Sequence, residues 1–168
     1  KAGLPKGVVN VVHGFGETLG SELVDNKLVE GVSFTGSREV GSLIMQQCGK
    51  HIKDCSLELG GKNPVIVMDD ANLDNAVEAI LFGAFGTAGQ RCTATSRVIV
   101  QSKIKEKLLH KLMARTKSLR LGNPLHEKTD IGPLINVRAL EKVSSYCQIG
   151  VDEGAKLLVG GKIANLSQ

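Results

Sequence analysis

The chain has 168 residues, of which 42% are hydrophobic and 23% are charged, a balance that is ordinary for a soluble globular protein. The net charge of +4 is spread along the chain and aromatic residues make up only 3% of it, which argues against a stacking platform for nucleic acid. No apolar stretch approaches the roughly 20 residues of a membrane-spanning helix, so we expect neither nucleic acid nor a membrane as a partner.

The first 68 residues alternate apolar runs with helical patterns and glycine-containing turns. They predict, in chain order, the end of a helix at 1–5, a strand buried on both faces at 8–12, a helix at 18–25, a strand at 29–34, a helix at 38–48, and strands at 53–59 and 64–68. Strands and helices that alternate at this pitch are typical of βαβ units around a parallel sheet, and so of an α/β fold.

The rest of the chain continues this pattern with longer helices. It predicts a helix at 73–88 capped by Asn72 or Asp70, a strand at 97–101, helices at 103–117 and 137–150, and a short strand at 156–159. The helix at 103–117 is amphipathic with a basic face, which we interpret as a solvated face rather than a nucleic-acid site.

The four cysteines are irregularly spaced, and no two of them form a C-x-x-C pair. The sequence therefore gives little support to a zinc site, and we expect no bound metal. A chain that can bury an adequate core does not need disulfides, so a reducing, cytoplasmic location is expected.

The first segment of chemical interest is Phe34–Gly41, at a predicted strand-to-helix junction. Free N–H groups and the positive end of the helix dipole make such a junction suitable for phosphate, and glycine allows a pyrophosphate to approach the backbone. The alternative is an ordinary tight turn, which this glycine spacing alone does not exclude.

The second segment, Leu57–Pro64, places Glu58 at the end of an apolar strand beside two glycines. We expect this carboxylate to be partly desolvated, with its pKa raised towards the range of a general base. The alternative is an exposed carboxylate at a strand end.

The third segment, Gly89–Ala94, contains Cys92 in a glycine-flanked turn after a helix. A cysteine in such a turn is accessible to substrate, and the neighbouring Arg91 and free N–H groups would favour its thiolate form. Inert, small hydrophobic side chains are the better interpretation of the other three cysteines: Cys48, Cys55 and Cys147.

Together the three segments resemble those of the NAD(P)-dependent aldehyde dehydrogenase superfamily. That family is recognised by an F-T-G-S segment, then E-L-G-G-K-[SN]-P, then G-Q-x-C about thirty-four residues after the glutamate, and the same interval separates Glu58 from Cys92. The similarity extends over essentially the whole chain. The turn around Cys92 is most similar to that of the semialdehyde dehydrogenases.

The resemblance implies an internal fragment of an α/β enzyme. Residues 1–59 would be the later half of a Rossmann-like coenzyme domain, and residues 60–168 the first part of the catalytic domain. An asparagine that completes the oxyanion site would lie upstream, and an E-E-x-F-G-P segment downstream. By itself such a piece is expected to be inactive, aggregation-prone or partly unfolded.

The resemblance also implies the residue roles. Cys92 would attack the aldehyde, its backbone N–H would bind the resulting oxyanion, and Glu58 would activate the water that releases the acid. The expected coenzyme is NAD or NADP. Six positions would line its site, with Gly36, Ser37 and Leu59 near the nicotinamide and pyrophosphate, and Gly16, Val40 and Leu43 around the adenine.

Arg91 has two interpretations: it would suit a substrate with a distal carboxylate, or it forms a structural salt bridge. Two rival functions also stay open. A CoA-acylating relative would usually lack the glutamate that is present here as Glu58, and a non-catalytic protein derived from the family would not need to keep both Glu58 and Cys92. We expect a small aldehyde as the substrate and a homodimer or homotetramer as the parent assembly.

Overall fold

The computed structural model describes residues 3–165, and the chain divides into two compact units, Lys1–Gly60 and Gly61–Gln168. The coenzyme and catalytic roles expected for residues 1–59 and 60–168 remain predictions. Among the helices that the structure describes, none combines the length and the apolar character needed to cross a membrane.

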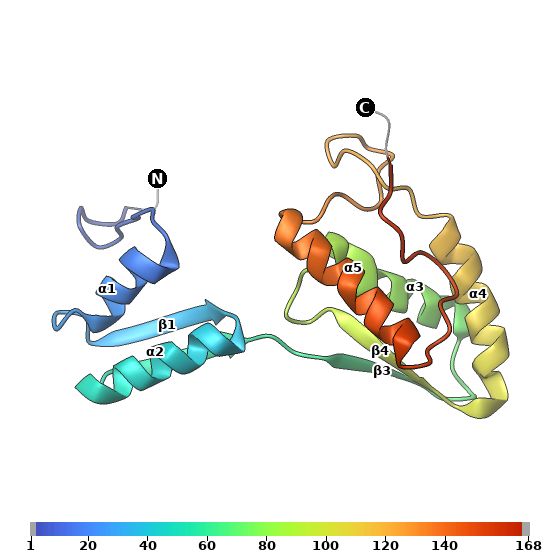
Figure 1. The fold of residues 1–168 in the computed structure, drawn as a ribbon, viewed down its shortest axis with the longest axis horizontal. Coiled ribbons are helices and arrows are strands. Elements are labelled where there is room, and N and C mark those ends of the chain that lie inside the picture. The colour runs from blue at the N-terminus through green and yellow to red at the C-terminus, as the bar shows by residue number, and fades with distance from the viewer. Residues whose placement is uncertain (1–2, 166–168) are drawn as a thin grey trace. The chain divides into compact units, whose positions relative to one another are not determined.

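The first unit contains a short parallel sheet with a helix on one face. In chain order it has a π-helical turn at Gly16–Gly20 that runs into α1 (Ser21–Asp25), then β1 (Gly31–Gly36), α2 (Arg38–His51) and β2 (Asp54–Leu59) (Figure 1). The strands β1 and β2 pair in parallel from Gly31 opposite Asp54 to Gly36 opposite Leu59. The predicted βαβ unit with a parallel sheet is therefore confirmed.

The helix α2 covers one face of this sheet. Cys55, Leu57 and Leu59 alternate with more exposed residues along β2, and the Leu59 side chain lies so close to Gly41 of α2 that a Cβ on that glycine would be 2.7 Å from its Cδ2 atom. Gly41 and Cys48 are the buried residues of α2. The helix and strand can approach this closely because Gly41 has no side chain.

Residues 8–12 do not form the predicted buried strand. Val8, Val9, Val11 and Val12 are 61–75% exposed. A strand needs a neighbouring strand for its backbone groups, and within the described part of the chain β1 and β2 pair only with each other. Of the predicted helix end at 1–5, residues 1 and 2 lie outside the described residues, and residues 3–5 are irregular.

The second unit is built around another parallel strand pair joined by a helix. Its elements are β3 (Asn63–Val67), α3 (Leu73–Phe85), β4 (Thr95–Val100), α4 (Lys105–Lys117) and α5 (Val137–Asp152), with 3-10 turns at Gly86–Gly89 and Ser102–Ile104. Asn72 caps α3, as predicted: its side-chain oxygen accepts hydrogen bonds from the N–H groups of Asp74 and Asn75.

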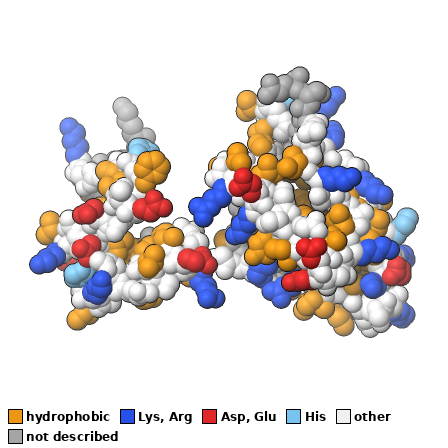
Figure 2. All heavy atoms as spheres, in the orientation of Figure 1, with side chains coloured by type: hydrophobic (Ala, Val, Ile, Leu, Met, Phe, Trp, Pro, Cys, Tyr) orange, Lys and Arg blue, Asp and Glu red, His pale blue; other side chains and the backbone are white. Residues whose placement is uncertain are grey.

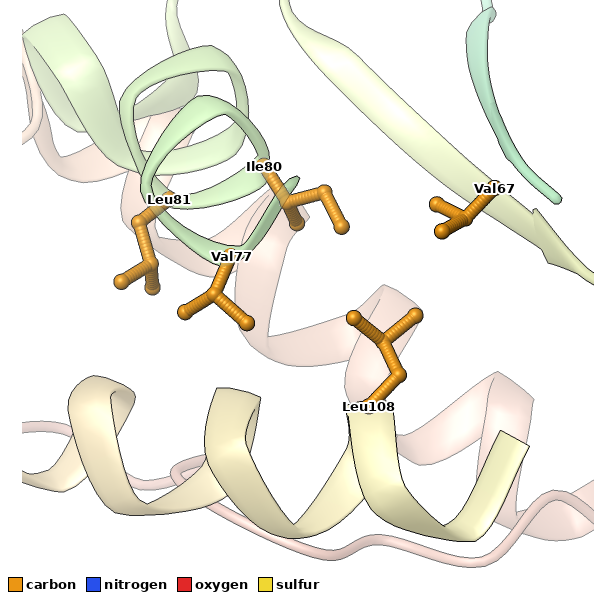
Figure 3. Close-up of a cluster of buried hydrophobic side chains, with 5 residues drawn as sticks. All are labelled: Val67, Val77, Ile80, Leu81 and Leu108. Carbon is orange, nitrogen blue, oxygen red and sulfur yellow. The ribbon is translucent and has the colours of Figure 1, made fainter. Parts of the chain in front are cut away.

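The core of this unit lies between α3, α4 and the sheet. Figure 3 shows its buried side chains pointing towards one another: Val67, Val77, Ile80, Leu81 and Leu108. Burying each stabilises the fold by roughly 1.5–3 kcal/mol. Charged side chains of α4 face α3, where Lys111 pairs with Asp74 at 2.5 Å and Arg115 with Glu78 at 2.6 Å.

A loop after α4 is closed by an ion pair. The Arg120 guanidinium and backbone N–H donate to the Asp130 carboxylate, at 2.9–3.0 Å, beside a single bridge between Leu121 and Ile131. These hydrogen bonds from Arg120 lower the pKa of Asp130 to about 2. The carboxylate therefore stays charged well below neutral pH.

The short strand predicted at 156–159 is absent. Residues 155–158 are irregular, and Leu157 and Leu158 are 52% and 37% exposed. Neither of the two apolar segments predicted as strands, here and at 8–12, pairs with a strand in the part of the chain that the structure describes, so neither gains the backbone hydrogen bonds of a sheet.

Candidate functional site

The helix α3 leads to the turn that contains Cys92, three residues before β4 begins at Thr95. Gly83 allows α3 to pack closely on β4, since a Cβ on that glycine would overlap the Thr95 hydroxyl. After α3 the backbone turns sharply through three residues with left-handed φ values, Thr87 (55°), Ala88 (54°) and Gly89 (71°). This conformation costs energy for residues other than glycine and is maintained by its surroundings.

Arg91 anchors this turn to the end of α3. Its Nη2 atom donates to the backbone oxygens of Phe82 at 2.9 Å and Gly83 at 3.4 Å, and its guanidinium lies 4.9 Å from the centre of the Phe82 ring. The Phe82 oxygen also accepts the Gly86 N–H, so Arg91 adds a second donor to the last turn of α3, where a cation complements the negative end of the helix dipole.

Arg91 makes no ion pair in the part of the chain that the structure describes, so its structural contact is with a helix end rather than with the carboxylate that a salt bridge would require. Its Nε atom is buried without a hydrogen-bond partner there. A role in substrate binding remains a prediction.

Asn63, the first residue of β3, contacts the other side of the cysteine. Its Nδ2 atom donates to the backbone oxygen of Cys92 at 2.7 Å and to that of Ala94 at 3.3 Å. Gly61 lies against the same oxygen, which would be 3.2 Å from a Cβ on that glycine. No role was expected for Asn63 from the sequence. Its place opposite Thr95 depends on a register shift between Asn63 and Pro64 in the β3–β4 pair, and no local sequence signal indicates that shift.

Gln90 connects the same turn to the segment before α5. Its Oε1 atom accepts a hydrogen bond from the N–H of Ile135 at 3.0 Å, and its Nε2 atom donates to the Thr87 oxygen at 3.4 Å. An apolar groove lies behind the turn, lined by Phe85 and Ala88 together with residues from 116–147 and 159–164. Cys92 is not among the lining residues.

The cysteines differ in accessibility. All four are free, and of these Cys92 is exposed, Cys55 and Cys147 are partly exposed, and Cys48 is 1% exposed. Desolvation and a hydrogen bond with Cys48 raise the pKa of the Cys55 thiol, which makes that residue a poor nucleophile. A nucleophilic cysteine must be accessible to its substrate, and Cys92 meets this condition.

Glu58 lies on the uncovered face of β2, directly opposite Thr35 of β1. The expected partial desolvation of its carboxylate is wrong for this chain, because α2 covers the opposite face of the sheet and Glu58 is exposed. Glu58 belongs to the first unit and Cys92 to the second. Their meeting in one active site therefore remains a prediction.

Four of the six predicted coenzyme residues lie at the β1–α2 junction and in the first half of α2. Gly36 and Ser37 form the β1–α2 junction, where Ser37 caps the helix by accepting the Val40 N–H at 3.2 Å. Val40 and Leu43 are 45% and 64% exposed. Gln47 lies one turn after Leu43 on α2 and donates a hydrogen bond to Asp25 of α1. The accessible Val40 and Leu43 side chains therefore lie next to a contact between the two helices.

This arrangement fits a dinucleotide in two respects. A helix N-terminus preceded by glycine suits a phosphate, and accessible aliphatic side chains nearby suit a base. A side chain at Gly36 would collide with the Phe34 ring, so the junction remains open at that residue. Of the other two predicted positions, Gly16 begins the exposed π-helical turn and Leu59 packs on Gly41.

Almost the whole chain is similar to proteins of known function. It is 48% identical over 162 residues to the alpha-ketoglutaric semialdehyde dehydrogenase of Bacillus subtilis, and 48% identical over 162 residues to the betaine aldehyde dehydrogenase of the same organism, each alignment covering 96% of this chain and 33% of the relative. The betaine aldehyde dehydrogenase of Staphylococcus aureus, solved in complex with NAD+, superposes with a TM-score of 0.94 at 41% identity over 98% of this chain and 33% of that chain.

The chain thus spans about a third of the length of the curated relatives it matches. The aldehyde dehydrogenase family model matches residues 1–168. The fold expected from the motifs is confirmed, since the structures that it resembles are themselves aldehyde dehydrogenases. The chain belongs to the aldehyde dehydrogenase family.

Proposed function

We propose that the full-length protein oxidises an aldehyde to a carboxylic acid with NAD or NADP, and that Cys92 is its nucleophile. The observation that carries this proposal is the exposed Cys92 thiol in a turn fixed by Arg91 and Asn63. A nucleophile must be accessible yet confined to one orientation, and this turn provides both conditions.

In the reaction the Cys92 sulfur bonds to the aldehyde carbon, and the carbonyl oxygen becomes an oxyanion. The Cys92 N–H would donate a hydrogen bond to this oxygen. The bound coenzyme supplies the acceptor for hydride leaving the same carbon, which converts the adduct into a Cys92 thioester. Glu58 then takes a proton from the water that attacks the thioester, and the acid leaves as the sulfur regains its charge.

The first unit would bind the coenzyme. Gly36, Ser37 and the start of α2 would contact the pyrophosphate and nicotinamide region together with Leu59, and Val40, Leu43 and Gly16 would border the adenine. The choice between NAD and NADP stays open for this chain. The S. aureus relative was solved with NAD+.

The substrate would be a small aldehyde. Equal identity to a semialdehyde dehydrogenase and to a betaine aldehyde dehydrogenase favours neither substrate class. Binding of a distal carboxylate by the Arg91 Nη2 atom would compete with the two α3 carbonyls that this atom now contacts. The presence of Glu58 supports transfer of the acyl group to water rather than to CoA. A homodimer or homotetramer is the assembly that we propose.

The test is to replace Cys92 in the full-length enzyme. Cys92→Ser and Cys92→Ala should lower aldehyde oxidation by at least about a thousandfold, because removing a nucleophile leaves only binding and electrostatic contributions. Cys147→Ser, a partly exposed cysteine of α5, is the matched control and should stay active. Activity above about one per cent in both Cys92 variants would contradict the assignment.

A further inference from the structure

Two side chains fix the backbone on the two sides of Cys92. On the amino side, Arg91 is anchored to the Phe82 and Gly83 carbonyls. On the carboxyl side, the Asn63 amide donates to the Cys92 carbonyl at 2.7 Å. The φ and ψ angles of a residue set the direction of its Cα–Cβ bond, so restraining both adjacent peptide groups restrains the direction in which the Cys92 side chain leaves the backbone.

Gly61 and Asn63 enclose the Cys92 carbonyl. A Cβ on Gly61 would be 3.2 Å from that oxygen and 3.3 Å from the Asn63 Oδ1 atom, closer than most Cβ atoms approach such groups. A side chain at position 61 would therefore displace the carbonyl or its donor, which glycine avoids. The second Asn63 hydrogen, directed at the Ala94 oxygen at 3.3 Å, extends this restraint to the start of β4.

We propose that Asn63 is a positioning residue for catalysis, one that sets the orientation of the Cys92 thiol and N–H relative to the aldehyde. The inference rests on the proposed function. It assigns to Asn63 a task beyond stabilising the fold, because the thiol and the N–H must meet the carbon and the oxygen of one carbonyl group at the same time. An error of about 1 Å in such an arrangement costs about a hundredfold in rate.

Three substitutions in the full-length enzyme distinguish a positioning role of Asn63 from a purely structural one. Asn63→Ala removes both hydrogen bonds, and we expect kcat to fall about 10–100-fold while KM changes less than about threefold. Asn63→Asp has the same shape but turns a charged oxygen towards two carbonyl oxygens, so its kcat should fall further. Asn63→Ser offers one short donor, the residue type also found at this position in the E-L-G-G-K-[SN]-P segment, and should recover part of the kcat.

The matched control is Asn72→Ala. It also removes an asparagine that makes two hydrogen bonds to backbone, but at the far end of α3, where the loss affects the stability of the helix alone. Among folded molecules its kcat should equal that of the wild type. A purely structural Asn63 would behave in the same way, with a lower melting temperature and an unchanged kcat, and that result would overturn the proposal.

Alkylation of Cys92 by iodoacetamide gives a readout that does not depend on turnover. We expect the labelling rate of Cys92, followed by peptide mass spectrometry from pH 6 to 10, to change in Asn63→Ala and Asn63→Asp and to remain at the wild-type value in Asn72→Ala. Unchanged labelling together with unchanged kcat would contradict the role of Asn63. If Cys92→Ser keeps its activity, the nucleophile assignment fails instead, while altered labelling in the Asn63 variants would still show positioning.

If Asn63→Ala does not fold, Gly61→Ala tests the same point. Its Cβ would press on the Cys92 carbonyl without removing a hydrogen-bonding group, so the carbonyl must move by a few tenths of an ångström. A lower kcat in this variant supports the proposal, and a wild-type kcat contradicts it.

Discussion

The side chains around Cys92 act mostly on the backbone. Arg91 donates to the Phe82 and Gly83 oxygens, and Asn63 donates to those of Cys92 and Ala94. Arg91 was expected to bind a substrate carboxylate or to form a salt bridge, yet in the structure it caps α3. Its positive charge is therefore partly balanced by the negative end of that helix dipole, and it is less available to the thiol than the sequence suggested.

Glu58→Gln in the full-length enzyme separates the two halves of the proposed reaction. The amide keeps the shape of the carboxylate but cannot take a proton from water, so thioester formation should continue while its hydrolysis becomes slow. Stopped-flow absorbance at 340 nm should show one burst of reduced coenzyme per active site, followed by a slow steady rate.

Loss of the burst together with turnover would show that Glu58 activates the thiol instead. Two controls are measured under the same conditions: the burst of the wild type and the burst of Glu17→Gln. Glu17 is an acidic residue in the first turn of the π-helical segment.

At the level of single residues, the sequence predicted which segments form the candidate site better than it predicted which side chains contact one another there. The spacing of the glutamate and cysteine segments led to Cys92, whose exposure the structure shows. Asn63 could not be found in this way, because its hydrogen bonds depend on the pairing of β3 with β4, and no local pattern encodes that register. The expected partial desolvation of the Glu58 carboxylate was wrong for this chain, because a strand pattern does not tell which face a helix will cover.

Both parallel strand pairs depend on a glycine that lets a helix approach closely. Gly41 of α2 packs against Leu59 of β2, and Gly83 of α3 packs against Thr95 of β4. Since α3 ends near the turn that contains Cys92, the Gly83 contact also fixes how far that turn lies from the sheet.

Gly83→Ala is therefore expected to destabilise the protein although alanine favours helix. The Cβ would overlap the Thr95 hydroxyl, and overpacking of this kind costs about 1–3 kcal/mol, more than the gain of about 1 kcal/mol in helix propensity. Urea denaturation of the full-length protein would measure the change.

Gly150→Ala is the matched control, in α5 of the same unit. A Cβ there meets nothing within 4 Å, so the substitution should stabilise the protein by up to about 1 kcal/mol. Stabilisation by Gly83→Ala as well would show that α3 can move away from β4.

Most elements were predicted within a few residues, since caps and apolar periodicity are local signals. The Asn72 cap and the helix at residue 38 are examples. The two strands that failed, at 8–12 and 156–159, have suitable residues but no pairing partner in the described part of the chain. Strand formation depends on a distant segment in a way that a helix does not.

On the scale of the whole chain, large apolar side chains remain accessible in both units (Figure 2). In the first unit they include the exposed valines of residues 8–12, and the second unit holds the larger share of the buried core. Exposed apolar segments without regular backbone pairing are sites of association.

The 168-residue chain by itself is therefore expected to associate and to bind a hydrophobic dye such as ANS. Light scattering across a concentration series would measure association. Val9→Lys with Val11→Lys should reduce it without loss of secondary structure, because these side chains are 66% and 75% exposed and support no core. A monomer that binds no dye and melts in one sharp transition would contradict this expectation.

The four hydrogen bonds that Arg91 and Asn63 direct around Cys92 share one property: every acceptor is a main-chain oxygen, which belongs to the peptide unit and not to a particular amino acid. The side chains at Phe82 and Ala94 can therefore be exchanged without deleting an acceptor. If Cys92 is the nucleophile that we propose, residues at these two positions can change while the hydrogen bonds that fix its backbone are kept. Substrate specificity can then change by side-chain substitution while the backbone around Cys92 keeps its conformation.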